Sequence, residues 1–83
     1  MAFSVRLLAF AGARDILGAA EMDVAVEGPV AASRFLDDLC AKHPGLVPYK
    51  RALRIAVNGS YVAWEDAVSP GDEVALIPPV AGG

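Results

Sequence analysis

One amphipathic helix set between alternating segments is the feature that most constrains the fold of this 83-residue chain. Apolar residues recur at helical spacing and share one stripe: Ala32, Phe35, Leu36, Leu39 and Cys40. Charged residues take the other side: Arg34, Asp37, Asp38 and Lys42. Because a helix must bury its apolar stripe against another element, and its neighbours have strand periodicity, the pattern predicts a helix packed on one face of a sheet.

The sequence predicts the end of this helix more clearly than its start. Two starts are open, with Pro29 at the first helical position or Ser33 as the N-cap. The end is predicted at His43-Pro44-Gly45, because Pro44 disfavours helical geometry at His43 and Gly45 tolerates a positive φ. Residues 47–52 are then predicted to form an irregular link.

Two alternating segments precede the helix. Residues 3–10 and residues 21–27 each predict a strand, and the two are expected to pair as a hairpin. The first strand turns alternate residues to one face: Phe3, Val5, Leu7 and Ala9. Residues 12–18 between the strands predict a short helical turn closed by Gly18.

Three further strands are predicted after the helix, at residues 53–57, 61–64 and 73–77. The first of them turns alternate residues inward: Leu53, Ile55 and Val57. Asn58-Gly59 predicts a type I′ hairpin turn, since both residues tolerate positive φ, and residues 69–72 predict another turn. This order of elements predicts one α+β domain over residues 1–83, folded as a roll.

Composition and patterning argue against several functional classes. The net charge of −3, without a basic run, argues against nucleic acid as a partner. The N-terminal residues alternate rather than form a signal peptide, and no segment approaches the roughly 20 apolar residues of a membrane span. Cys40 is the single cysteine, so no internal disulfide can form, and the cytoplasm is the expected location. We expect no metal site and no catalysis by this chain alone, because no metal-ligand spacing and no Ser/His/Asp or Cys/His constellation is evident.

The C-terminal segment is the part of the sequence that indicates a chemical function. It reads Ile77-Pro78-Pro79-Val80-Ala81-Gly82-Gly83, where the prolines end the last strand and favour a stiff extended backbone. Residues 78–83 reach roughly 20 Å at about 3.3–3.6 Å per residue, enough to enter a narrow pocket of a partner protein. The α-carboxylate of Gly83 is a poor electrophile, but an acyl-adenylate made from ATP would activate it, and a sulfur donor would convert the adenylate to a thiocarboxylate.

Other interpretations of these residues are simpler. Many chains end in small residues, so a terminal Gly-Gly is weak by itself, and its place directly after a strand ending in Pro-Pro is what gives it weight. Cys40 is predicted to be a buried small hydrophobe on the helix stripe. His43 is predicted to be a favourable charge or a packing residue at the helix end.

Several motifs resemble those of the sulfur-carrier small subunits of molybdopterin synthases, a ubiquitin-like family. They are the segment from Phe10 to Gly18, His43-Pro44-Gly45-Leu46, Val57-Asn58-Gly59 and the segment from Gly71 to Gly83. The resemblance spans nearly the whole chain, and the last thirteen residues are its most specific part.

This resemblance implies a β-grasp fold, with a mixed sheet of about five strands on one main helix. It implies that an ATP-dependent activating enzyme adenylates Gly83 and that a sulfur donor then forms the thiocarboxylate. The tail would enter the large synthase subunit, within a heterotetramer, and deliver sulfur to a cyclic pyranopterin precursor of the molybdenum cofactor. No cofactor would be bound by this chain itself, since ATP is used by the activating enzyme.

Four residues outside the tail are candidates for partner binding. Phe10, Tyr61 and Ile77 are predicted on the open face of the sheet, where a cluster would indicate an interface and scattered residues would not. Arg14 matches a basic position of the family, and either pairs across an interface or pairs locally with Asp15 or Glu21.

Three other functions remain open from the sequence. The chain could carry sulfur for thiamine, cysteine or tRNA thiolation. It could be a ubiquitin-like modifier joined to lysines through Gly83, because both routes share the adenylate. It could also be an interaction module in which Gly-Gly is incidental.

Overall fold

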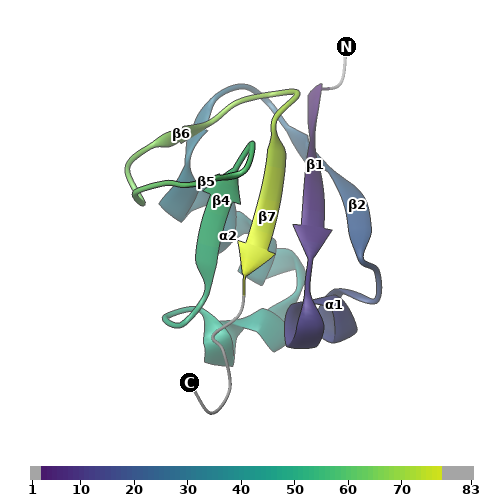
Figure 1. Cartoon of the computed structure of the whole chain (residues 1–83). Helices are drawn as coiled ribbons and strands as arrows, with labels where there is room; N and C mark the ends of the chain where they lie inside the picture. Colours follow the sequence, from purple (N-terminus) through teal and green to yellow (C-terminus); the bar gives the residue numbers. More distant parts are fainter. Residues whose placement is uncertain (1–2, 78–83) are drawn as a thin grey trace.

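The computed structural model describes residues 3–77, and its centre is a five-stranded mixed sheet (Figure 1). The strand order is β2-β1-β7-β4-β5. The strands span β1 (Phe3–Ala9), β2 (Glu21–Val26), β4 (Arg54–Val57), β5 (Ser60–Tyr61) and β7 (Glu73–Ile77). β1 and β7 run parallel at the centre, and the other neighbouring pairs are antiparallel.

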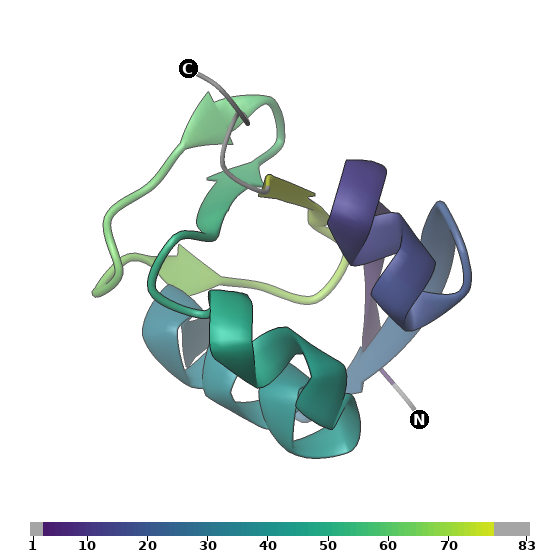
Figure 2. The same ribbon diagram turned by 90° about the horizontal axis from the view of Figure 1, so that it is seen from below.

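Helices cover one face of this sheet and one of its ends. The main helix α2 (Ala32–Lys42) lies behind the sheet in Figure 1, with α1 (Ala11–Leu17) beyond the C-terminal end of β1. Figure 2, seen from below, shows α2 continuing into the 3₁₀ helix η1 (Pro44–Tyr49). A second, two-stranded sheet pairs β3 (Val30–Ala31) with β6 (Ala67–Val68).

The core lies between α2 and the inner face of the sheet. All five residues of the predicted helix stripe are buried there. They meet the alternate residues of the central strands: Val5, Leu7, Ala9, Ile55, Val74 and Leu76. The prediction of an α+β fold with one main helix on a mixed sheet is therefore confirmed, because the two periodicities bury one continuous apolar layer.

The predicted start of the main helix is wrong in both of its versions. The helix begins at Ala32, because Val30 and Ala31 are extended and pair with Val68 and Ala67. Neither Pro29 nor Ser33 therefore begins it. Backbone carbonyls replace the expected side-chain cap, since Ala32 N donates to Asp66 O at 2.8 Å and Ser33 N donates to Trp64 O at 3.0 Å.

The predicted strand at residues 61–64 is also mostly wrong, because β5 ends at Tyr61. A turn replaces the rest: Ala63 N donates to Asp66 Oδ2 at 2.9 Å, and Asp66 N donates to Ala63 O at 3.0 Å. An aspartate that satisfies a nearby backbone N–H favours a turn over a ladder. The irregular link at residues 47–52 is likewise wrong in part, since η1 runs to Tyr49.

The Asn58-Gly59 turn has the predicted conformation, with φ of 51° and 88°. Asn58 also ties this turn to the start of β7. Its backbone N–H donates to Glu73 O at 2.7 Å, and its side-chain Oδ1 accepts from Glu73 N at 3.0 Å. Its Nδ2 donates to Asp72 Oδ1 at 3.1 Å. The hairpin and the last strand are thereby held in one register.

Candidate functional site

The sheet positions the chain where it leaves the last strand. Ile77 is the last described residue, at the end of β7, and the predicted tail of Pro78, Pro79, Val80, Ala81, Gly82 and Gly83 lies outside the described residues. β7 is parallel to β1, so its end lies at the edge of the sheet where β1 continues through Phe10 into α1 (Figure 1). β7 is bonded to a strand on both sides, so the point at which the chain leaves it is held in place by the sheet.

The open face of the sheet carries an apolar row across four strands. Register places Leu8 beside Ala75, Ala75 beside Ala56, and Ala56 beside Tyr61. Their side chains point away from α2, because the alternate residues of the same strands form the core. Tyr61 is 63% exposed at the end of this row.

A second row lies one step nearer the exit of the chain. Ile77 is half-buried and pairs with Arg54. Phe10 follows β1 on the same side and is 50% exposed. The Arg54 guanidinium carbon lies 5.1 Å from the centroid of the Tyr61 ring, a cation–π distance.

These two rows join Phe10, Tyr61 and Ile77, the three residues predicted on this face. We call the two rows the open-face patch, formed by Leu8, Phe10, Arg54, Ala56, Tyr61, Ala75 and Ile77. Leu8, Arg54, Ala56 and Ala75 were missed by sequence reasoning, although the alternation of their strands places them on the same side.

Arg14 lies on α1 and is exposed. Within residues 3–77 no ion pair joins it to Asp15 or Glu21. Glu21 pairs with Arg6 instead, with 3.6 Å between Oε2 and Nη1. The local ion pair, one of the two alternatives predicted for Arg14, is therefore not formed among the described residues. The contact with a partner protein stays a prediction.

Cys40 and its neighbours offer no reactive centre. Burial raises the pKa of the Cys40 thiol above its ordinary value, Lys50 opposes this and Asp37 adds to it. Lys50 Nζ pairs with Asp37 Oδ1, and this hydrogen bond raises the pKa of the lysine. Between Phe3 and Ile77 no three His, Cys, Asp or Glu side chains are arranged to hold a metal ion. Over the same residues, no helix combines the length and apolar character needed to cross a bilayer.

A raised thiol pKa has a defined consequence for stability. The folded protein disfavours the thiolate, so this contribution to stability is present below the ordinary pKa of 9.0 and is lost as pH rises through the higher folded value. We expect the free energy of unfolding, measured by urea titration, to fall above pH 9, and to fall less steeply in Cys40→Ala. Equal slopes in the two proteins would contradict the assignment.

Comparison with known proteins adds the relationship that geometry alone does not give. The model of the ThiS family matches residues 7–83. The chain belongs to the ThiS family. The molybdopterin synthase sulfur carrier subunit of Homo sapiens is 33% identical over 82 residues, covering 95% of this chain and 93% of that protein. The Arabidopsis thaliana protein of the same name is 30% identical, covering 95% and 82%. The resemblance inferred from the motifs is confirmed.

Solved structures confirm the fold. SAMP1 from Haloferax volcanii superposes with a TM-score of 0.78 at 31% identity, covering 96% of this chain and 99% of that one. A ubiquitin from Caldiarchaeum subterraneum has a TM-score of 0.65 at 16% identity, covering all of both chains, and shows the fold alone. The predicted ubiquitin-like β-grasp architecture is therefore correct.

Proposed function

We propose that this ThiS-family chain is the sulfur-carrier subunit of a molybdopterin synthase and that the α-carboxylate of Gly83 carries the sulfur. The observation that carries the proposal is that the family match runs to Gly83 and that the two relatives of this name described above align over 93% and 82% of their own length. A sulfur carrier needs a reachable terminal carboxylate more than a pocket of its own. The two glycines leave that carboxylate without neighbouring side chains.

The proposed chemistry takes two steps, both on partner enzymes. The Gly83 carboxylate attacks the α-phosphorus of ATP, which releases pyrophosphate and leaves an acyl-adenylate. A sulfur nucleophile then attacks the acyl carbon, so that a C–S bond forms, the C–O bond to AMP breaks and AMP leaves with its electron pair. The resulting thiocarboxylate is the nucleophile that a large synthase subunit would direct at a pyranopterin precursor. The role of this chain is delivery, with the catalytic groups on the partners, in the cytoplasm.

The open-face patch is proposed as the surface that docks on those partners. It combines exposed aromatic and half-buried aliphatic side chains with the end of β7, so a protein bound there also meets the start of the tail. Arg14, on α1 at the same end of the sheet, is proposed to contribute a charged contact at its rim.

Intact-mass spectrometry tests the carrier function directly. The protein is incubated with its activating enzyme, ATP and a sulfide source, and then weighed. A mass increase that matches replacement of one oxygen by sulfur, located on Gly83, is expected. An unchanged mass with active enzyme and a functional control carrier would contradict the proposal.

The docking surface has its own test. Phe10→Ala with Tyr61→Ala is expected to weaken binding to the large subunit by at least about tenfold, because buried aromatic side chains carry much of the energy of an interface. Tyr49→Ala is the matched control, since Tyr49 is 51% exposed but lies on η1. Binding is measured by isothermal titration calorimetry. An equal loss in the control would show that the patch is not the docking surface.

A protein modifier is the second candidate function. The observation that favours it is a 32% identical relative, small archaeal modifier protein 1 of Haloferax volcanii, which covers 89% of this chain and 94% of that protein. If the chain is a modifier, lysine conjugates through Gly83 should appear in cell extracts. Their presence without sulfur on Gly83 would select the modifier.

A further inference from the structure

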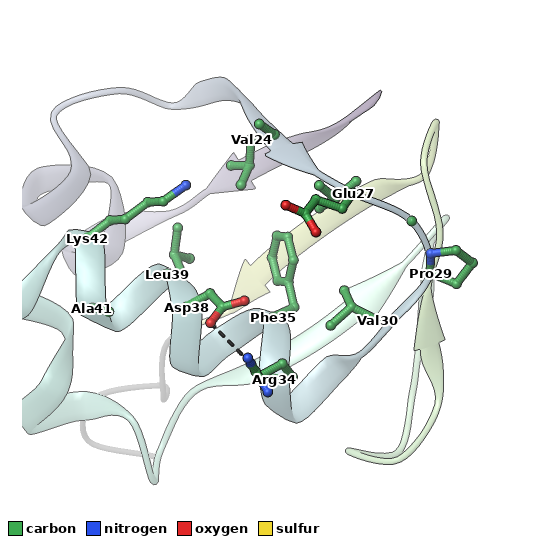
Figure 3. A pocket seen from close by; sticks show the side chains of 13 residues that line it. Val24, Glu27, Pro29, Val30, Arg34, Phe35, Asp38, Leu39, Ala41 and Lys42 are labelled. Carbon is green, nitrogen blue, oxygen red and sulfur yellow. Dashed lines mark hydrogen bonds and ion pairs between the residues drawn. The ribbon is translucent and has the colours of Figure 1, made fainter. Parts of the chain in front are cut away.

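The edge of the sheet at β2 is distinct from the open-face patch. Within residues 3–77, β2 pairs with β1 alone, while the patch lies toward β5 at the opposite edge. Between β2 and α2 runs a groove of about 590 Å³ (Figure 3). Neither the tail chemistry nor the proposed docking uses this groove.

The outer edge of β2 carries backbone N–H and C=O groups that can pair with an added strand. Ala9 N donates to Ala20 O at 2.9 Å, whereas Arg6 N donates to Asp72 O at 3.0 Å on the other side of β1. Bonding therefore alternates along β1, and in the observed register the even-numbered residues of β2 face β1. The N–H and C=O groups of Glu21, Asp23 and Ala25 consequently point away from β1, toward the free edge.

The groove beside this edge has an apolar floor. Val24 and Val26 reach it from β2, and Phe35 and Leu39 reach it from α2 (Figure 3). Val24 and Val26 are only half-buried. A strand added at the edge would turn alternate side chains onto this floor.

The charged residues of β2 and of the position directly after it are all acidic. Glu21, Asp23 and Glu27 are exposed along β2 and directly after it. Arg6 pairs with Glu21, and Arg34 pairs with Asp38 at 3.3 Å, one turn apart on α2. Lys42, near the end of α2, is a cation that also lines the groove. No ion pair within residues 3–77 involves Asp23 or Glu27. Asp23 lies on the face of β2 away from the groove, where an added strand would place its second set of side chains. Glu27 lines the groove itself (Figure 3).

These charges favour some segments over others as the strand added at the edge of β2. A second copy of β2 would bring the same carboxylates together, and like charges on adjacent strands are destabilising. The tail of this chain has no basic residue, and its two prolines cannot donate to a ladder. A segment that alternates basic and apolar residues can place its apolar side chains on the groove floor and its cations beside the carboxylates.

We propose that the free edge of β2 and the groove beside it bind an extended, basic segment of a partner protein, in which Lys or Arg alternates with apolar residues. The segment adds a strand to the sheet through Asp23 and Ala25. Its apolar side chains contact the groove floor, and its cations face Asp23 and Glu27. The site is independent of the proposed sulfur chemistry, because it contains neither the tail nor the open-face patch.

A short capped peptide that alternates lysine and valine, labelled with fluorescein, tests this proposal. Anisotropy gives the affinity, and NMR amide shifts give the location. We expect saturable binding with shifts confined to β2 and α2. Asp23→Lys with Glu27→Lys should weaken it by at least about tenfold, whereas Asp15→Lys with Glu65→Lys, with the same change in net charge elsewhere, should not. Ala25→Pro should also weaken it, because proline removes an edge N–H without touching the β1 ladder.

Several outcomes would overturn the proposal. These are no binding, shifts on the open-face patch, equal binding of a serine-valine peptide, preferential binding of a peptide with the sequence of residues 78–83, and concentration-dependent dimerisation through β2. Deleting Gly83 should leave peptide binding unchanged. That deletion separates failure of this site from failure of the sulfur-carrier function.

Discussion

Deletion of Gly83 is expected to abolish sulfur loading while leaving the fold intact. The deletion moves the terminal carboxylate back by about 3.3–3.6 Å, one extended residue. A displacement of about 1 Å can cost about 100-fold in an enzyme that relies on positioning, so loading should fall by more than about 100-fold. Thiocarboxylate formation is measured by intact mass over time with the activating enzyme.

The matched control for this deletion is Gly82→Ala, which keeps the length of the tail and adds one methyl group. It should load more slowly than the natural chain but faster than the deletion, because the carboxylate still reaches the adenylating site. Circular dichroism melts of both variants should match the natural protein, since Gly82 and Gly83 lie beyond the last strand. Normal loading of the shortened chain would refute the assignment of Gly83.

Leu76→Ala is expected to have the largest effect on stability. Leu76 is fully buried on β7, between β1 and β4, where it pairs with Ala9 and Ile55. Truncating a buried leucine costs about 2–5 kcal/mol, against a total of about 4–12 kcal/mol for a domain of this length. The melting temperature should fall by at least about 10 °C, measured by calorimetry.

Ile77→Ala is the control on the neighbouring residue of the same strand. Ile77 points to the open face and is half-buried, so its truncation should lower the free energy of unfolding by less than Leu76→Ala does. It should instead weaken docking on the large subunit. If both variants unfold at the same temperature, the assignment of inner and outer faces on β7 is wrong.

The sequence predicts most of the sheet because its strands alternate clearly and its turns have distinctive residues. β7 has its predicted limits at Glu73 and Ile77, and β2 extends only to Val26 instead of 27. The small sheet of β3 and β6 was not predicted, since a pair of two-residue strands has too few positions for a period to appear. The start of α2 depends on that sheet, because the carbonyls of Trp64 and Asp66 accept its first N–H groups.

The residues of the candidate site are likewise only partly predictable from the sequence. The sequence predicts Phe10, Tyr61 and Ile77 on the open face of the sheet. The register of β4 with β5 and β7 places Tyr61 and Ile77 there, and Phe10 follows β1 on the same side. Arg54 was missed as a member of that face because its position over Tyr61 depends on pairing between strands, which no local pattern encodes. The β2 groove likewise depends on how α2 lies against the sheet.

The central position of β7 has a consequence for synthesis of the protein. Among residues 3–77, β7 is the last strand to be synthesised, yet it fills the gap between β1 and β4. The N-terminal hairpin can pair early, but the two halves of the sheet cannot join until β7 has been synthesised. A chain that stops before β7 lacks both the strand that completes the sheet and the glycine that would be activated. Completion of the sheet therefore shows that synthesis has passed β7. It does not report on the last residues, since the chain without Gly83 is expected to fold as well.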